Sequence, residues 1–243
     1  MDLFKAIQAV SRRFGLDIVP YNAGAHPVAR RQRLFEVCRI DTVLDVGANV
    51  GQFGIELRRQ FGFRGRIVSF EPLTAAFEML AATARRDPNW QVLNLALGDQ
   101  RTTLDFNIAS NSESSSLLAM LDAHLKAAPY SAYCGLERVA VETLDALFDD
   151  VCAGSKNIYL KIDTQGYESH VLRGASRSLE RIDTVQLELS LTPLYAGQRL
   201  FHELCDDMIG RGYVLVGLEN NFGSGQTGRL LQVDGIFRRD RTH

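Results

Sequence analysis

The segment Val43–Phe53, with the sequence VLDVGANVGQF, constrains the fold more than any other part of the chain. It begins as an apolar run, passes through a turn that contains Gly47 and Gly51, and ends as the start of a helix. A second apolar run, at 67–70, is followed directly by Glu71. Glycines let the backbone approach a ligand, and an acid at the next strand tip can accept hydrogen bonds from ribose hydroxyls. The pattern therefore predicts a nucleoside pocket in an α/β fold.

The spacing of this turn disfavours a dinucleotide. A pyrophosphate site uses G-x-G-x-x-G, with backbone N–H groups at a helix N-terminus facing the phosphates. Here the order is Asp45-x-Gly47-x-Asn49-x-Gly51, so the turn opens with an acid and has no glycine at position 49. An acid suits a cationic ligand better than a phosphate, because like charges repel. S-adenosylmethionine, with its ammonium and sulfonium, meets this requirement. The alternative is that both glycines serve only the turn of an ordinary α/β unit.

Composition limits the class of protein further. A length of 243 residues with 46% hydrophobic content suits one α/β domain, or one domain with a small addition. The net charge of −2 predicts no nucleic-acid partner. The four cysteines form no CxxC pair, which argues against zinc and a disulfide framework and fits a reducing cytoplasm. The apolar runs are strand-length, so we expect neither a signal peptide nor a transmembrane segment.

Strand-like and helix-like segments alternate over most of the chain. Strands are predicted at 43–46, 66–70, 91–95, 157–162 and 184–189, with helices at 52–61, 73–85, 167–179 and 197–210. Two more strands, at 213–218 and 230–237, follow without an intervening helix. We therefore expect an α/β fold with a mostly parallel sheet, helices on both faces and a C-terminal antiparallel hairpin at one edge.

The region at about 100–145 interrupts this alternation. It carries strands at 103–108 and 138–142, separated by the serine-rich stretch 110–116 and a helical segment that ends near Ala128. Its apolar content is too high for disorder, and long loops in compact domains usually serve function. We expect an insertion or lid.

The first 39 residues form a second exception. Helices are predicted at 2–14 and 28–39, which makes 1–39 an N-terminal helical cap or extension on a domain at 40–243. The apolar face of the first helix is expected to pack on the body or on a partner subunit, which would allow a homodimer. The alternative is contact with a membrane interface that carries a lipid-linked substrate, placing a cytoplasmic protein at the membrane periphery.

Five segments together resemble the FkbM type of S-adenosylmethionine-dependent methyltransferase. They are LDVGANVGQF at 44–53, FEP at 70–72, NLALGD at 94–99, LKIDTQGYE at 160–168 and QLELS at 186–190. The resemblance covers about residues 40–238. It implies the Rossmann-like class I methyltransferase sheet, whose last strand is antiparallel. The first 40 residues and the detail of 110–135 are not covered, and we expect substrate choice to lie there.

The resemblance also implies roles for particular residues. Asp45 would anchor the glycine turn and reach the amino group of the cofactor through water, Glu71 would hold the ribose hydroxyls, and Ala96-Leu97 would flank adenine. The methionine end of the cofactor would be wrapped by Gly47, Ala48, Asn49 and Gly51. Members of this family methylate oxygens on sugars and polyketide-type molecules, or sometimes nitrogen.

Candidate catalytic residues lie at the ends of two later strands. Asp163 ends one strand and Glu188 lies near the end of the next, so both face the cofactor edge of the sheet. His170 lies about one turn into the helix between them. A sugar hydroxyl must lose a proton, so one of the three is expected to act as general base. The alternatives are that Asp163 caps the helix, that Glu188 hydrogen-bonds the 164–168 turn, and that His170 lies at the surface or behind the site.

Two acids at neighbouring strand tips could also hold a divalent cation through oxygen ligands. No third carboxylate lies beside Glu188, because Leu189-Ser190-Leu191 follows it, so the metal-free interpretation is favoured.

The sequence thus favours an O-methyltransferase that acts on a sugar hydroxyl of a glycolipid or glycosylated natural product, with a small-molecule or lipid-linked sugar as acceptor. The alternatives are an N- or O-methyltransferase for a non-sugar small molecule, a dinucleotide oxidoreductase and a non-catalytic nucleoside-binding module.

Overall fold

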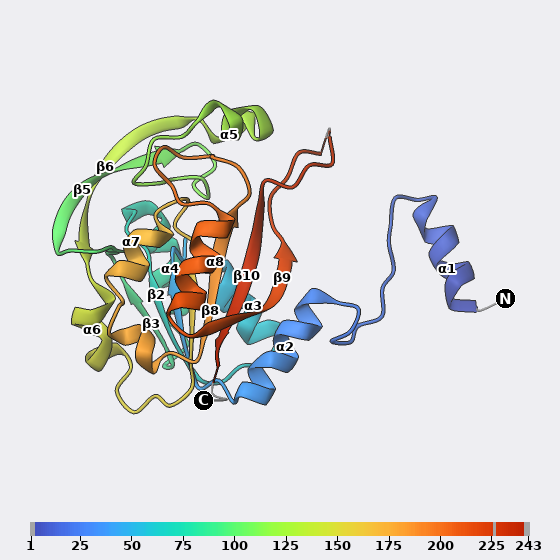
Figure 1. Ribbon diagram of the computed structural model, residues 1–243, viewed down its shortest axis with the longest axis horizontal. Helices are drawn as coiled ribbons and strands as arrows, with labels where there is room; N and C mark the ends of the chain where they lie inside the picture. The colour runs from blue at the N-terminus through green and yellow to red at the C-terminus, as the bar shows by residue number, and fades with distance from the viewer. Residues whose placement is uncertain (1–2, 226, 241–243) are drawn as a thin grey trace. The chain divides into compact units, whose positions relative to one another are not determined.

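The computed structural model describes residues 3–225 and 227–240. Contacts between Cα atoms divide the chain into two units, Met1–Arg39 and Ile40–His243. The first unit holds helices α1 (Leu3–Arg12) and α2 (Pro27–Cys38), close to the predicted segments except that Asp2 lies outside the described residues (Figure 1). The cap, dimer and membrane roles of this unit stay predictions.

The second unit is built on a seven-stranded sheet with the order β3-β2-β1-β7-β8-β10-β9. The strands are β1 (Thr42–Val46), β2 (Arg66–Phe70), β3 (Trp90–Leu93), β7 (Ile158–Ile162), β8 (Thr184–Ser190), β9 (Tyr213–Asn220) and β10 (Gln232–Arg239). All neighbours are parallel except β10, which is antiparallel to both β8 and β9. The mostly parallel α/β sheet with a C-terminal antiparallel hairpin is confirmed. The hairpin inserts its second strand between β8 and the edge strand β9, which the sequence did not indicate.

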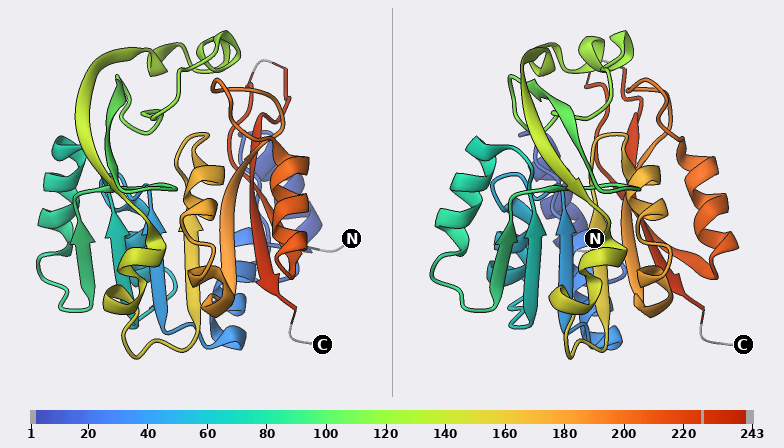
Figure 2. Two further views of the ribbon diagram at one scale, coloured as in Figure 1. Left: turned by 60° about the vertical axis from the view of Figure 1, so that its left-hand side comes forward. Right: turned by 90° about the vertical axis from the view of Figure 1, so that its left-hand side faces the viewer.

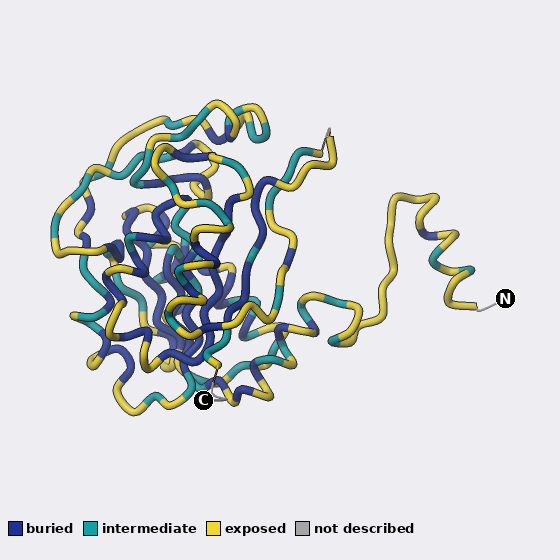
Figure 3. The backbone as a smooth tube through the Cα atoms, viewed as in Figure 1, coloured by how far each residue is buried: buried dark blue, intermediate teal, exposed yellow. Residues whose placement is uncertain are grey.

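Helices lie on both sides of this sheet (Figure 2). They are α3 (Gln52–Arg59), α4 (Thr74–Ala84), α6 (Leu144–Val151), α7 (Glu168–Arg173) and α8 (Phe201–Gly210). One hydrophobic core joins strand residues such as Leu44, Leu160 and Leu187 to Leu172 of α7 and Met208 of α8. Because side chains alternate along a strand, the residues between these apolar positions point to the opposite face. The buried strands appear as the dark centre of the tube in Figure 3.

Helix α7 is shorter than the predicted 167–179 and is followed by the separate 3-10 turn η2 (Ser178–Arg181). Gly174 is the C-cap residue of α7. A Cβ atom there would overlap the carbonyl oxygen of Gly98, so only glycine fits at this position. Helix α8 likewise starts later than predicted, because Gly197 has a left-handed backbone with φ 74°. A close backbone approach at Gly174 and a left-handed turn at Gly197 thus accompany the two differences, and hydrophobic periodicity indicates neither.

The predicted insertion forms a second sheet together with a short strand that precedes it. Strands β4 (Ala96–Leu97), β5 (Thr102–Ala109) and β6 (Tyr133–Glu142) pair in the order β4-β6-β5. The β5–β6 connection carries α5 (Asp122–Ala127) and a 3-10 turn, η1 (Pro129–Ser131). Figure 2 shows this hairpin and its connection arching above the carboxyl ends of the parallel strands. Among the described residues, no helix is long and apolar enough to cross a membrane.

Candidate functional site

The glycine turn after β1 is built from left-handed backbone. Gly47, Asn49 and Gly51 have φ angles of 77°, 46° and 94°. The N–H groups of Gly47 and Ala48 both donate to the Phe70 carbonyl at 3.1 Å, which holds the turn against the end of β2. A Cβ atom at position 47 would overlap the carbonyl oxygen of Asp163, so glycine is required where the turn meets the end of β7.

Glu71 ties the turn to the tip of β2. Its buried carboxylate accepts hydrogen bonds from the N–H groups of Asn49 at 2.8 Å and Leu73 at 2.9 Å. Burial raises the pKa of Glu71 to about 7. Each carboxylate oxygen has one of these bonds and a further lone pair. A role in holding ribose therefore fits this geometry and stays a prediction.

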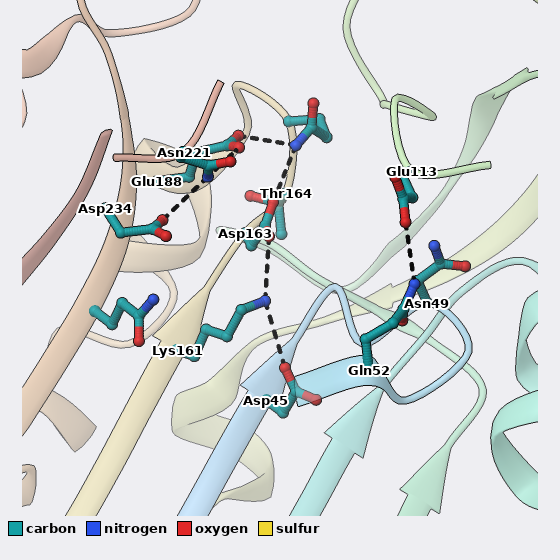
Figure 4. Close-up of polar contacts among 12 residues, drawn as sticks. Asp45, Asn49, Gln52, Glu113, Lys161, Asp163, Thr164, Glu188, Asn221 and Asp234 are labelled. Carbon is teal, nitrogen blue, oxygen red and sulfur yellow. Dashed lines mark hydrogen bonds and ion pairs between the residues drawn. The ribbon is translucent and has the colours of Figure 1, made fainter. Parts of the chain in front are cut away.

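Asp45 forms an ion pair inside the sheet. It is fully buried on β1, and Lys161 lies beside it in register on β7, with Nζ 3.6 Å from Oδ1 (Figure 4). Ser69 donates its hydroxyl to the other carboxylate oxygen at 3.3 Å. Burial raises the pKa of Asp45, and the charge of Lys161 opposes that shift. Lys161 was not predicted as a site residue, although its place on β7 two residues before Asp163 puts the two side chains on the same side of the chain.

The structure brings Asp163 and Glu188 together. Lys161 Nζ lies 3.2 Å from Asp163 Oδ2, so one ammonium bridges Asp45 and Asp163 (Figure 4). The Gln165 amide donates to Asp163 Oδ1 at 3.0 Å and to Glu188 Oε2 at 2.9 Å. A single side-chain amide thus joins the two predicted acids, whose catalytic roles stay predictions.

A further acid, Asp234, lies on β10 directly opposite Glu188. Asn221 donates to both carboxylates, at 3.1 Å to Glu188 and 3.2 Å to Asp234. Burial, followed by the charge of Asp163, raises the pKa of Glu188 well above its ordinary value. Burial raises the pKa of Asp234 to about 6. The sequence gives no sign of Asp234 or Asn221 at this site, because their place depends on β10 pairing with β8.

Two backbone N–H groups of the 163–168 turn are hydrogen-bonded by a side chain of the same turn. Glu168 accepts from the N–H groups of Thr164 at 3.0 Å and Gly166 at 3.1 Å. The Asp163 carboxylate accepts from the Lys161 and Gln165 side chains, and α7 has no side-chain hydrogen bond at its N-cap residue, Tyr167, so the alternative role of Asp163 as a helix cap is not seen. The alternative for Glu188, a hydrogen bond to this turn, is present through the Gln165 side chain.

His170 lies away from the acid pair. Its ring stacks on Tyr167, with centroids 3.9 Å apart and planes 3° apart. Burial lowers the pKa of His170. Within the described residues, none of its contacts is with Asp163 or Glu188, so the structure does not bring the third predicted base to the other two.

The two residues predicted to flank adenine form strand β4. Ala96 and Leu97 are both buried, and their side chains belong to hydrophobic clusters that also hold Val141 and Leu144. Contact with adenine stays a prediction for this pair.

The insertion reaches the glycine turn from above. The Asn49 amide lies 3.3 Å from the Ser112 hydroxyl, and the Gln52 amide donates to the Glu113 carboxylate at 3.2 Å (Figure 4). The serine-rich stretch therefore borders the predicted cofactor turn.

The insertion also reaches the turn after β7. The Ser116 hydroxyl donates to the Gln165 carbonyl at 2.7 Å. The Tyr195 hydroxyl lies 2.7 Å from Gln165 Oε1 and 3.2 Å from the Ser114 carbonyl. The serine-rich stretch of the insertion thus contacts both the glycine turn after β1 and the turn after β7. No group of three or more His, Cys, Asp or Glu side chains among the described residues is arranged to hold a metal ion.

These features define a class I methyltransferase, with a glycine turn and Glu71 at the first two strand tips and acids at later ones. The chain belongs to the methyltransferase FkbM family, because the model of the FkbM methyltransferase domain matches residues 45–215. No curated protein matches its sequence.

Solved structures with related folds are distant. An rRNA methylase from Streptococcus thermophilus has 8% identity and a TM-score of 0.48, with 88% of this chain and 97% of that chain covered. Magnesium protoporphyrin IX methyltransferase from Synechocystis PCC 6803, with bound S-adenosylmethionine, has 10% identity and a TM-score of 0.45, covering 88% and 85%. Similarities this low carry no argument about the substrate.

Proposed function

We propose that this protein transfers a methyl group from S-adenosylmethionine to a hydroxyl oxygen of a sugar, on a glycolipid or a glycosylated natural product. One observation carries the proposal: the glycine turn contacts the chain at Asp163 so closely that position 47 has no room for a side chain. The predicted cofactor turn and the predicted acid pair therefore lie next to each other.

The residues present fit the cofactor. Gly47, Ala48, Asn49 and Gly51 would hold its methionine end, and Glu71 has lone pairs left for the ribose hydroxyls. Asp45 would act through the turn rather than on the ligand, because it is fully buried and paired with Lys161. S-adenosylmethionine, when bound, supplies an electrophilic methyl group on a sulfonium.

The acid pair would manage the acceptor proton. As the acceptor oxygen gains its new C–O bond, its proton passes to the carboxylate of Glu188 or Asp163. Burial raises the pKa of Glu188, and a base whose pKa lies nearer the working pH is more effective. Such a base contributes about 10²–10⁴-fold, while alignment of the reactants contributes roughly 7–11 kcal/mol.

Calorimetric titration of the purified chain with S-adenosylhomocysteine, and separately with NAD, tests the cofactor. We expect binding of the former alone, and its loss in Glu71→Ala. A panel of glycosides, followed by mass spectrometry for an added methyl group, then tests the acceptor. Binding of NAD alone, or methylation only of amines or non-sugar molecules, would contradict the proposal.

A further inference from the structure

Gln165 has an unusual backbone for a residue with a long side chain. Its φ angle is 52°, in the left-handed region, and Gly166 follows with φ 97°. A non-glycine residue held in this region persists where surrounding contacts fix it, and such residues concentrate at functional sites. The contacts of Gln165 show what fixes it.

The side-chain amide of Gln165 has only one favourable orientation. Its nitrogen donates to Asp163 Oδ1 and Glu188 Oε2, and its oxygen faces the Tyr195 hydroxyl at 2.7 Å. A flipped amide would place its oxygen against two carboxylates. Burial raises the pKa of Tyr195 far above its usual range, so the hydroxyl keeps the proton that it donates.

The insertion fixes Gln165 at its backbone as well. The Ser116 hydroxyl is fully buried and donates to the Gln165 carbonyl at 2.7 Å. Tyr195, which orients the amide, is also buried and lies 3.2 Å from the Ser114 carbonyl. A chain of hydrogen bonds thus runs from Ser116 of the insertion to Gln165, and the Gln165 side chain continues it to both carboxylates.

We propose that Gln165 is a positioning residue for proton acceptance, holding Asp163 and Glu188 side by side through one amide whose own position is set by Tyr195 and Ser116. This inference rests on the proposed methyl transfer for its role in catalysis, but the geometry can be tested without an acceptor. Without the amide, neither carboxylate receives the Gln165 hydrogen bond that offsets their mutual repulsion. The Glu188 carboxyl should therefore hold its proton more tightly, which raises its pKa.

Gln165→Gly is the decisive variant, because glycine adopts the left-handed backbone without strain and removes only the side chain. Gln165→Asn is the second variant, since asparagine tolerates the same backbone but its shorter amide falls short of the two acids. Tyr213→Phe is the matched control. It removes a buried hydroxyl that donates to the Leu179 and Ile182 carbonyls, in a part of the core without contact to Gln165.

The first readout is the titration of the Glu188 carboxyl, followed by carbon NMR of the full chain with labelled glutamate and assigned with Glu188→Gln. We expect Gln165→Gly and Gln165→Asn to raise its midpoint by about one pH unit, and Tyr213→Phe to leave it unchanged. An unchanged midpoint in both Gln165 variants, or an equal shift in Tyr213→Phe, overturns the inference.

The second readout is turnover of whichever glycoside the panel identifies. Gln165→Gly should lower kcat by about 10²-fold, with S-adenosylhomocysteine affinity within about twofold of the parent chain. A kcat within twofold of the parent overturns the catalytic role. Failure of the parent chain to bind S-adenosylhomocysteine contradicts the proposed function instead, and the NMR titration still decides whether Gln165 couples the acids.

Discussion

Gly47 and Asp163 meet where the turn after β1 touches the end of β7, and their backbones leave no space for a side chain between them. This contact places the two halves of the site, one for the cofactor and one for the acids, at a fixed separation. It also makes position 47 sensitive in a way that its left-handed φ alone does not explain.

Gly47→Ala should therefore abolish measurable S-adenosylhomocysteine binding and lower the melting temperature. Gly154→Ala is the matched control, because Gly154 has nearly the same φ, 79° against 77°, with no atom near its absent Cβ. The control should lose only about 1–2 kcal/mol of stability from backbone strain and bind normally. Equal effects of the two substitutions, measured by calorimetry and thermal unfolding, would show that strain rather than the Asp163 contact matters.

Cofactor binding should strengthen as pH rises. Burial raises the pKa of Glu71 to about 7, so at pH 6 most of its carboxyl is protonated and at pH 8 most is ionised. The ionised form accepts ribose hydroxyls better, so the Kd of S-adenosylhomocysteine should be about tenfold higher at pH 6 than at pH 8. Glu71→Gln should bind weakly with little change over this range. A parent Kd that is flat with pH would remove Glu71 from the ribose site.

Lys161→Met should destabilise the fold by about 3–5 kcal/mol, because it leaves Asp45 buried without its cation. Asp45→Asn combined with Lys161→Met should recover part of this loss, since the uncompensated charge is gone. Arg33→Met is the surface comparison. It breaks an exposed pair with Glu36 and should cost at most about 1 kcal/mol. Urea unfolding measures these three variants and Asp45→Asn alone, and a double variant whose effect equals the sum of the two single effects would argue against the pairing.

The free energy of unfolding should fall between pH 5 and pH 7.5. Burial raises the pKa of Glu168 to about 7 from an ordinary value of 4.5, so the folded chain binds its proton more tightly than the unfolded chain does. This contribution is fully present below about pH 4.5 and is lost as pH rises through 7. Glu168→Gln should flatten the profile by about 1–3 kcal/mol, whereas Glu78→Gln, at an exposed position, should not. An unchanged slope in Glu168→Gln would contradict this assignment.

The sequence was most informative where hydrophobic pattern and turn chemistry agree. The strand that contains Leu44 and Val46, the turn at Gly47 and Gly51, and Glu71 at the next tip all lie where local pattern predicts them. Asp163 and Glu188 were also expected near each other, because one follows a parallel strand and the other lies near the end of the next. In each case the spatial relationship follows from the general geometry of α/β sheets.

The partners of those acids could not be found in the same way. Asp234 meets Glu188 only because β10 enters between β8 and β9, and Asn221 reaches both acids from the loop before β10. Gln165 gains its role from Tyr195, a residue in a loop thirty positions later. These contacts depend on register and loop closure between distant segments, which hydrophobic periodicity does not encode.

The position of β10 has a consequence for how the protein is made. Because this strand lies between β8 and β9, both remain without their common neighbour until residues 232–239 have left the ribosome. A nascent chain that has emerged only as far as β9 lacks Asp234 and exposes the edge of β8 to other strands. Assembly of the acid cluster is therefore tied to synthesis of β10, so a nascent chain that lacks residues 232–239 cannot contain the complete cluster.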